Sequence, residues 1–264
     1  MLSKENMIEG LLRIYRYSGL IQVLVLRELK VRYRRTVLGL FWSFVNPLVL
    51  MLTYVLVFSV YFRVGMPHYS VYLLCGLLPW MCFSSGFVEA THSIINNAGL
   101  IKKVSLPSEI FPLVAVASNM VHYVLSLPIL LLFLAWFGFK FSYALVLFPV
   151  VLAVQLTFTY GLALVASSLV VSFRDLLHIV PNLLMVWMFV TPIIYAPEMV
   201  PARYRPLLDL NPMTGIIGAY HDIFFYGRFP PVQVLTVLAG VSFLVLVLGM
   251  AFFNARKDVF AEEI

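Results

Sequence analysis

Apolar residues run along this chain in long stretches that are separated by short polar joints. A helix needs about 20 mostly apolar residues to cross the hydrocarbon core of a bilayer. Six stretches meet this requirement, at residues 37–62, 69–89, 109–137, 141–173, 176–196 and 232–254. None of them alternates polar and apolar positions as the strands of a membrane β-barrel do. The pattern therefore predicts an all-α polytopic membrane protein with six transmembrane helices.

A charged segment precedes the first of these stretches. At about 100° per residue, four apolar side chains form one stripe of a helix, namely Leu26, Leu29, Tyr33 and Val37. Five cations flank this stripe, namely Arg27, Lys30, Arg32, Arg34 and Arg35. The pattern predicts an amphipathic helix on the membrane surface with a cationic collar, in which each cation contributes about 1 kcal/mol of attraction to an anionic leaflet.

This collar has two interpretations, and the sequence leaves both open. It can anchor the topology of the first span, or it can belong to a gate. The gate interpretation depends on the segment TVLGLFW (36–42), which carries no turn signal between collar and span. An uninterrupted helix would link the tilt of the collar to the tilt of the span. Asn46-Pro47 lies about ten residues inside the span and predicts a kink in either case.

Two connections between spans are longer than simple turns. Residues 91–108 follow the second span, and we expect a short helix at 94–103 that is ended by Pro107. Residues 197–231 mix prolines with two apolar stretches, 205–210 and 213–226. An apolar stretch of fewer than about 18 residues is too short to span a bilayer. These two stretches therefore predict re-entrant or interfacial helices on the external side.

Composition agrees with a membrane protein and gives its orientation. Of the 264 residues, 62% are hydrophobic and only 11% are charged, whereas soluble domains are about 25% charged. Thirteen of the 18 lysines and arginines fall in segments on the same side as the N-terminus. Basic residues concentrate on the cytoplasmic side of membrane proteins, so both termini are expected to be cytoplasmic.

The sequence carries no signature of catalysis or metal binding. It contains no GxxxxGK[ST] loop, HExxH motif or GxSxG motif, so ATP hydrolysis by this chain is not expected. Cys75 and Cys82 share a helix face but lie about 10 Å apart along it, too far for a disulfide within the chain. The five histidines share no metal-ligand spacing. His122 is the only titratable side chain deep in a span, and we interpret it as a packing residue.

Aromatic side chains make up 15% of the residues. Those of the first two spans are Phe41, Trp42, Tyr54, Trp80, Phe83 and Phe87. Packing and the interfacial aromatic belt account for many such residues. A conduit for carbohydrate is the alternative, because sugar rings have apolar faces that stack on aromatic rings.

Four segments, in this order and at this spacing, resemble a known family. They are RELKVRYRRTVLGLFWSFVNPL (27–48), GLLPWMCFSSGFVEATHSIINNAGLIKKVSLPSEIFPL (76–113), SFRDLLHIVPNLL (172–184), and TPIIYAPEMVP (191–201) with LNPMTGII (210–217). The family is the membrane permease subunit of ABC exporters for lipid-linked polysaccharides, which handle O-antigen, capsule and teichoic acid. The resemblance covers nearly the whole chain.

The resemblance implies roles for particular residues. Interface and gate helices would occupy residues 1–36, with four residues near the cytoplasmic mouth: Arg27, Lys30, Tyr33 and Arg34. A coupling helix that docks on a separate ATPase would lie at 97–107, with contacts from Asn97, Leu100, Ile101, Lys102, Lys103 and Pro107, together with Arg174 and Asp175 of the next cytoplasmic turn. Asn211 and Pro212 would form the turn of an external gate. Similar proteins often carry arginine at the position of His221, so no role is assigned to this residue.

The resemblance also implies a function. A single transmembrane domain would fill residues 1–264, with a six-span bundle at 37–254 and a cytoplasmic tail at 255–264. Two copies would form a homodimer with two copies of the ATPase, which binds ATP and Mg²⁺, while this chain holds no cofactor or metal and binds no nucleic acid. The expected cargo is undecaprenyl-pyrophosphate-linked polysaccharide, with O-antigen preferred over capsule or teichoic acid, crossing the bacterial inner membrane. A drug permease and a membrane enzyme of polymer assembly remain as alternatives.

Overall fold

The structure is a computed structural model that describes residues 16–34, 36–61, 63, 65–103, 106–257 and 260. These residues are largely helical and form no strand. Helices long and apolar enough to cross a membrane lie at Trp42–Tyr61, Tyr69–Asn96, Ile110–Trp136, Tyr143–Ser172 and Val232–Arg256. The prediction of an all-α polytopic membrane protein is therefore confirmed, and five of the six expected spans contain a helix of sufficient length.

The elements follow one another with short connections. The α-helices are α2 (Ser18–Tyr33), α3 (Trp42–Tyr54), α4 (Tyr69–Asn96), α5 (Ala98–Lys103), α6 (Ile110–Trp136), α7 (Phe148–Ser172), α8 (Leu176–Val190), α9 (Arg205–Asp209), α10 (Pro212–Tyr220) and α11 (Val232–Arg256). Short 3-10 turns lie at Gly39–Phe41, Tyr143–Leu147, Pro197–Met199 and Ala202–Tyr204, and π-helical segments at Val55–Tyr61 (η2) and His221–Phe225 (η6).

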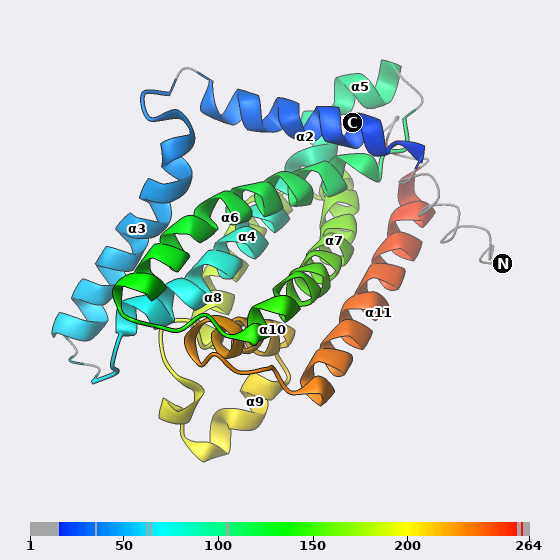
Figure 1. Cartoon of the computed structure of the whole chain (residues 1–264). Helices are drawn as coiled ribbons and strands as arrows, with labels where there is room; N and C mark the ends of the chain where they lie inside the picture. The colour runs from blue at the N-terminus through cyan, green and yellow to red at the C-terminus, as the bar shows by residue number, and fades with distance from the viewer. Residues whose placement is uncertain are drawn as a thin grey trace.

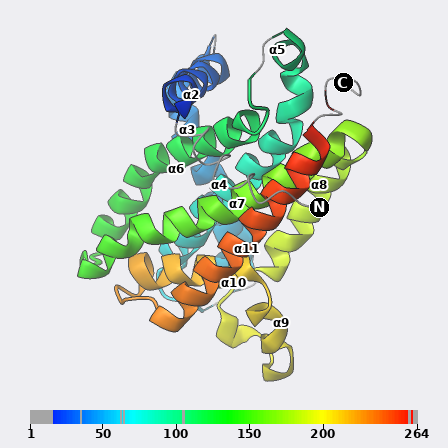
Figure 2. The same ribbon diagram turned by 90° about the vertical axis from the view of Figure 1, so that its right-hand side faces the viewer.

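Helix α4 lies at the centre of the bundle. It packs against α3, α6, α7, α8 and α10, and its side chains from Val71 to Trp80 are buried without interruption. Figure 1 shows α2 lying across one end of the bundle, with α5 at the same end and α9 at the opposite end. In the view of Figure 2, α11 runs alongside α7. The basic helices α2 and α5 therefore share one end of the molecule.

Two glycines allow α7 and α11 to cross in close contact. A Cβ atom at Gly161 of α7 would lie 2.7 Å from the backbone nitrogen of Leu246 on α11, and one at Gly249 of α11 would overlap the carbonyl oxygen of Gly161. Helices in membranes associate through small residues because close approach of the backbones maximises van der Waals contact. This crossing fixes the C-terminal helix on the bundle.

The expected continuous helix from the collar into the first span is not present. Helix α2 ends at Tyr33, Arg34 has an extended backbone, and α3 begins only at Trp42. Gly39, within the intervening segment, adopts a φ of +52°, which L side chains rarely adopt. A helix cannot pass through such a residue. The expectation that a continuous helix links the tilt of the collar to the tilt of the first span is therefore wrong. Gly39 is the turn signal in the segment 36–42.

The buried face of α2 also differs from the expected stripe. The side chain that faces the bundle most fully is Val25, with Ile21 and Leu29 half-buried beside it against α6. Leu26 and Val37, both expected on the stripe, are exposed. The buried face differs from the expected stripe because Glu28 and Arg32 face the bundle. Their polar groups have partners on α4 and α6.

The fifth expected span is a shorter helix than its apolar run. Helix α8 ends at Val190, and residues 191–196 continue without helical backbone, although they are mostly buried. Non-helical backbone at membrane depth needs partners inside the protein. The hydroxyl groups of Tyr69 and Tyr72 donate to the carbonyl oxygens of Ile194 and Tyr195 at 2.8 Å and 3.1 Å. Two tyrosines of α4 thus satisfy two of the backbone carbonyl groups in this non-helical segment.

The expected re-entrant helices are present at the end opposite to α2. Helix α9 covers the first apolar stretch, and α10 with η6 covers the second. Helix α10 is inserted against α4, α7 and α11, with Met213, Ile216 and Ile217 fully buried. His221 in η6 stacks on the ring of Tyr72, with centroids 4.0 Å apart. The α10–η6 segment is therefore an internal part of the fold, whereas α9 is exposed except at Leu208.

Candidate functional site

The expected coupling segment forms a short helix at the end of the bundle. Helix α5 follows α4 directly, and the amide of Asn97 between them donates to the carbonyl oxygen of Ser93 at 2.8 Å. Lys102 and Lys103 are exposed in the last turn of α5. Leu100 and Ile101, half-buried, pack against a cluster of buried residues that includes Phe111 and Phe253, from α6 and α11. Helix α5 is thus held by its apolar side and presents its basic side outward.

The remaining residues expected to contact an ATPase lie in two connections, one before α6 and one between α7 and α8. Pro107 is half-buried, and its carbonyl oxygen accepts from the backbone of Ile110 in the first turn of α6. Arg174 and Asp175 are exposed in the turn between α7 and α8, at the same end of the molecule as α5 (Figure 2). The carbonyl oxygen of Asp175 accepts from His178 and so starts α8.

A polar network attaches α2 to the bundle, and the sequence did not predict it. The guanidinium of Arg32 is ion-paired with Glu89 of α4 and donates to Oδ1 of Asn119 on α6 at 3.3 Å. The amide nitrogen of Asn119 donates to the same carboxylate of Glu89 at 2.7 Å. Arg32 is therefore hydrogen-bonded to residues of two bundle helices. These partners lie 57 and 87 residues further along the chain.

Glu28 makes a second attachment one turn earlier on α2. Its carboxylate accepts a hydrogen bond of 2.8 Å from the hydroxyl of Ser118 on α6. Burial raises the pKa of Glu28 above its ordinary value, and the hydrogen bond from Ser118 offsets part of that shift. Desolvation disfavours a charged carboxylate, whereas a donated hydrogen bond favours it. Glu28 is therefore more easily protonated than an exposed glutamate.

A groove of about 530 Å³ lies between α2, α4 and α6, and we call it the interfacial groove. Its charged and polar lining residues are Arg27, Glu28, Arg32, Glu89, His92, Ser93, Asn96 and Asn97. Arg27 belongs to the expected cytoplasmic mouth and is exposed, as are Lys30 and Arg34. The side chain of Tyr33 lies outside the described residues, as do residues 1–15 of the expected interface region and Arg35 of the collar. The groove therefore joins one expected gate residue to the unexpected network.

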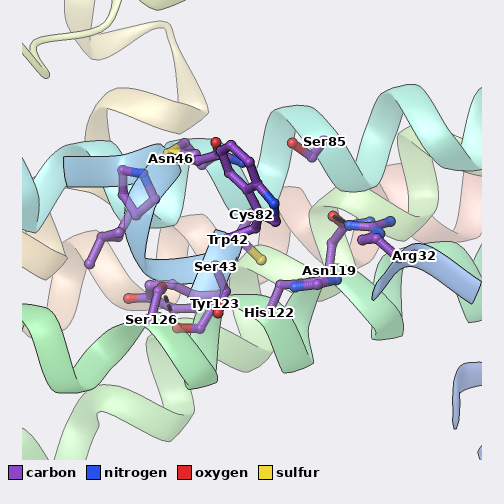
Figure 3. A pocket seen from close by; sticks show the side chains of 13 residues that line it. Arg32, Trp42, Ser43, Asn46, Cys82, Ser85, Asn119, His122, Tyr123 and Ser126 are labelled. Carbon is purple, nitrogen blue, oxygen red and sulfur yellow. Dashed lines mark hydrogen bonds between the residues drawn. The ribbon is translucent and has the colours of Figure 1, made fainter. Parts of the chain in front are cut away.

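A second cavity, of about 310 Å³, lies between α3, α4 and α6, and we call it the α3 pocket. Figure 3 shows its side chains. They are Trp42, Ser43, Asn46 and Pro47 from α3, Leu78, Met81, Cys82 and Ser85 from α4, Asn119, His122, Tyr123 and Ser126 from α6, and Arg32 from α2. Arg32 also lines the interfacial groove, so the two cavities adjoin at this side chain.

The aromatic side chains expected to line a conduit occupy different environments. Trp80 and Phe83 are buried in a cluster with Trp187 of α8, and the rings of Phe83 and Trp187 meet edge to face at 5.2 Å. Phe87 is half-buried and stacks on Phe83. Tyr54, also half-buried, contacts the sulfur of Met188, while Phe41 and Trp42 are exposed. Trp80 borders a groove of about 390 Å³ between α4 and α8.

Asn211 connects the end of α8 to the beginning of α10. Its Oδ1 accepts from the indole nitrogen of Trp187 at 2.8 Å and from the backbone of Met213 at 3.1 Å. Its amide nitrogen donates to the hydroxyl of Thr191 at 2.9 Å. Pro212 occupies the first position of α10, where its missing N–H removes no helical bond. The expected external turn is therefore a hydrogen-bonded joint between two helices.

Comparisons with known proteins agree with this architecture. Residues 19–225 match the family of ABC-2 type transporters. The chain is 39% identical to the O-antigen export system permease protein RfbA of Myxococcus xanthus, over 98% of this chain and 100% of that protein. A protein of the same description from Klebsiella pneumoniae is 33% identical over 92% and 94%. The polysialic acid transport protein KpsM of Escherichia coli is 24% identical over 90% and 93%.

Proposed function

This chain belongs to the ABC-2 type transporter family, and we propose from this premise that it is the permease subunit of an ATP-driven polysaccharide exporter. Its cargo is an undecaprenyl-pyrophosphate-linked polysaccharide, the O-antigen of lipopolysaccharide, which it moves across the bacterial inner membrane. Both termini face the cytoplasm, because most lysines and arginines lie on that side.

One observation carries this proposal. The chain is similar over 98% of its length to a relative that is named for O-antigen export, at 39% identity. Such coverage includes each of the segments that the structure places at the two ends of the bundle. The proposal therefore extends the relative's printed function to a chain that is similar to it over almost its whole length.

A separate ATPase subunit supplies the energy, and two copies of it bind ATP and Mg²⁺. Helix α5 suits the docking role because Lys102 and Lys103 protrude while Leu100 and Ile101 hold the helix against the bundle. Only Asn97 separates α5 from α4. A push on α5 is therefore transmitted to the last turns of α4.

Motion then passes from α4 to α2 through side chains. Glu89 lies two turns before the end of α4 and holds Arg32 of α2. The break at Gly39 prevents transmission through a continuous helix. The Arg32–Glu89 pair, with Asn119 beside it, takes the place of that helix in the coupling pathway.

The conduit forms between two copies of the chain. Helix α8 exposes a row of apolar side chains, Leu183, Met185, Val186, Phe189 and Val190. Helix α3 likewise exposes apolar side chains, among them Val49, Leu50 and Leu52. Two copies that face each other through these helices enclose the groove beside Trp80. Exposed apolar residues suit this arrangement, although lipid also covers such faces in membrane proteins.

Loading begins at the cytoplasmic end of the interfacial groove. Arg27 of α2 lines the groove, and Lys30 and Arg34 are exposed within and directly after the same helix. Cationic side chains form strong hydrogen bonds with phosphate oxygens. These residues attract the pyrophosphate of the lipid carrier. At the external end, the joint at Asn211 and Pro212 lets α10 respond to movement of α8, as an external gate requires.

Deletion of the gene in its native organism tests the proposed function. Export failure should remove the glycan from the cell surface while finished, lipid-linked glycan accumulates inside. Intact surface glycan in the deletion strain would contradict the proposal, and new sensitivity to drugs would then indicate a drug permease. Glycan that fails to elongate would instead indicate an assembly enzyme. Complementation with the intact gene is the control.

A capsular glycan is the second candidate cargo. The similarity to a polysialic acid transport protein, 24% identical over 90% of the chain, favours it less strongly than O-antigen. The same deletion strain separates the two, because loss of capsule with intact O-antigen would assign the second cargo.

A further inference from the structure

The α3 pocket reaches the midpoints of two helices, α4 and α6, that are long enough to cross a membrane. Cys82 is at the midpoint of α4, and His122 is at the midpoint of α6, and both line the pocket. A polar cavity at this depth replaces apolar packing that would stabilise the bundle. Polar and ionisable side chains inside a membrane are costly and usually serve function. The pocket therefore needs an explanation beyond the fold.

Uncharged hydrogen-bonding groups dominate the polar part of its lining. Three hydroxyl groups, two amides and one imidazole reach it, from Ser43, Ser85, Ser126, Asn46, Asn119 and His122. Trp42 and Tyr123 add aromatic rings (Figure 3). A ligand site typically combines an apolar wall with a few convergent polar groups, in a volume of about 300–1,000 Å³. The α3 pocket has this character.

Charge decides which ligand suits the pocket. Among the described residues that line the pocket, Arg32 alone is charged, and Glu89 neutralises it through their ion pair. An anionic ligand such as a phosphate would have to compete with that carboxylate. A lipid tail would offer no hydrogen bond to the amide of Asn46 or the hydroxyl of Ser85, which is costly in an apolar environment. A neutral ligand with many hydroxyl groups satisfies both constraints.

We propose that the α3 pocket binds one sugar residue of the exported glycan. The apolar face of the sugar ring packs on the indole of Trp42, which is exposed on the α3 wall. The sugar hydroxyl groups exchange hydrogen bonds with Asn46 of α3 and Ser85 of α4. The inference rests on the proposed function, because it takes the glycan as cargo, and it adds a binding site within one protomer.

The position of Arg32 gives the route to this site. Arg32 borders both the interfacial groove and the α3 pocket, so its ion pair with Glu89 lies between them. A glycan whose carrier phosphates are held by the collar at the groove has its first sugars beside this pair. Displacement of Arg32 admits one of these sugars into the pocket.

Thiol labelling tests the proposal, because Cys82 lines the pocket and Cys75 does not. Membranes containing the permease and its ATPase are treated with N-ethylmaleimide, from cells that make the glycan and from cells that lack its first glycosyltransferase. Mass spectrometry then follows each cysteine separately. If the site is mostly occupied, Cys82 should react about tenfold more slowly when glycan is present, since the rate follows the empty fraction. Both cysteines are buried, but Cys75 does not line the pocket and therefore serves as the internal control.

A photo-crosslinker gives an independent readout of the same site. Asn46→p-benzoylphenylalanine places the probe on the pocket side of α3, and Thr53→p-benzoylphenylalanine places it on the same helix outside the pocket. Both positions are exposed, so either variant should fold. Ultraviolet light should attach glycan to the first variant alone, seen as a ladder above the permease band after glycan staining.

The results separate this proposal from the proposed function. Protection of Cys82 together with a ladder at position 46 supports the sugar site. Equal reaction of Cys82 in both membranes, including no reaction in either, or no ladder at position 46, overturns it. If deletion of the chain still abolishes surface glycan, only the pocket assignment has failed. If surface glycan persists without the chain, the proposed function itself has failed.

Discussion

The guanidinium of Arg32 on α2 is ion-paired with the carboxylate of Glu89 on α4, 57 residues further along the chain. This contact holds the surface helix to the helix that continues into α5. Both side chains are about a third exposed, and exposed ion pairs contribute little to stability. The pair is therefore better suited to transmitting motion than to stabilising the fold.

Charge exchange tests this role of the pair. Arg32→Glu and Glu89→Arg should each lower export and the stimulation of ATPase activity by substrate, because like charges repel α2 from α4. The double variant should recover a large part of both, with a coupling energy of about 0.5–3 kcal/mol, as for residues in contact. Lys30→Glu, on the exposed side of α2, should not be rescued by Glu89→Arg. Additive losses in the double variant would contradict the assignment.

Charge reversal on α5 tests the docking surface. Lys102→Glu with Lys103→Glu should weaken binding of the ATPase subunit or uncouple its activity, because both side chains are exposed at the end of this helix. The permease should still fold and insert normally. Co-purification and ATPase assays measure the effect, with Lys140→Glu at the opposite end of α6 as the matched control. A normal complex with normal export would remove the docking role from these lysines.

The close crossing of α7 and α11 should tolerate no side chain at Gly249. Gly249→Ala places a methyl group against the carbonyl of Gly161, and overpacking of this kind costs about 1–3 kcal/mol. Gly240→Ala on the same helix meets open space and should leave the melting temperature unchanged or slightly higher. Thermal unfolding in detergent compares the two variants. Equal melting temperatures would show that the helices do not cross as closely as described.

Glu28 should make the attachment of α2 depend on pH. Its pKa is raised mainly by burial, so the folded state binds this proton more tightly than the unfolded state. Stability contributed at this site is therefore fullest below the ordinary pKa of 4.5 and falls as pH rises through the raised pKa of the folded state. Glu28→Gln keeps an acceptor for Ser118 and removes the charge. Its melting temperature should exceed that of the native chain at neutral pH.

The control for this prediction is the pH dependence itself. The advantage of Glu28→Gln should disappear at about pH 4, where the native carboxyl is protonated as well. Asp209→Asn, at an exposed carboxylate far from α2, should show no comparable advantage. The same difference between Glu28→Gln and the native chain at both pH values would count against a buried, ionised Glu28.

The sequence predicted the elements whose signal is local. Long apolar runs gave the spanning helices, and the short apolar stretches gave α9 and α10, because hydropathy and length alone determine these. The apolar run 176–196 predicted a longer helix than α8, which ends at Val190. Non-helical backbone can remain buried when other residues supply its hydrogen bonds. Tyr69 and Tyr72 supply the hydrogen bonds here. The sequence around residue 191 gives no indication of these distant partners.

Contacts between distant residues could not be predicted from the pattern. Arg32, Glu89 and Asn119 lie on three helices, and each alone looks like an ordinary polar residue of its helix. Gly39 carried a local signal, because a glycine between two apolar helices often marks a turn, but the apolar residues around it concealed the break. The sequence indicated Trp80 and Phe83 as aromatic residues that could line a conduit. Their packing against each other and against Trp187 is visible only in the structure.

Reconstitution tests the central claim most directly, that this chain is a passive conduit driven by a separate ATPase. The permease and its ATPase are placed in proteoliposomes that contain the lipid-linked glycan, and glycan accessible to an external glycosidase is followed after addition of ATP and Mg²⁺. The account predicts ATP-dependent movement of glycan only when both subunits are present, with no ATP hydrolysis by the permease alone. Movement of glycan, or hydrolysis of ATP, by the permease without its partner would contradict it.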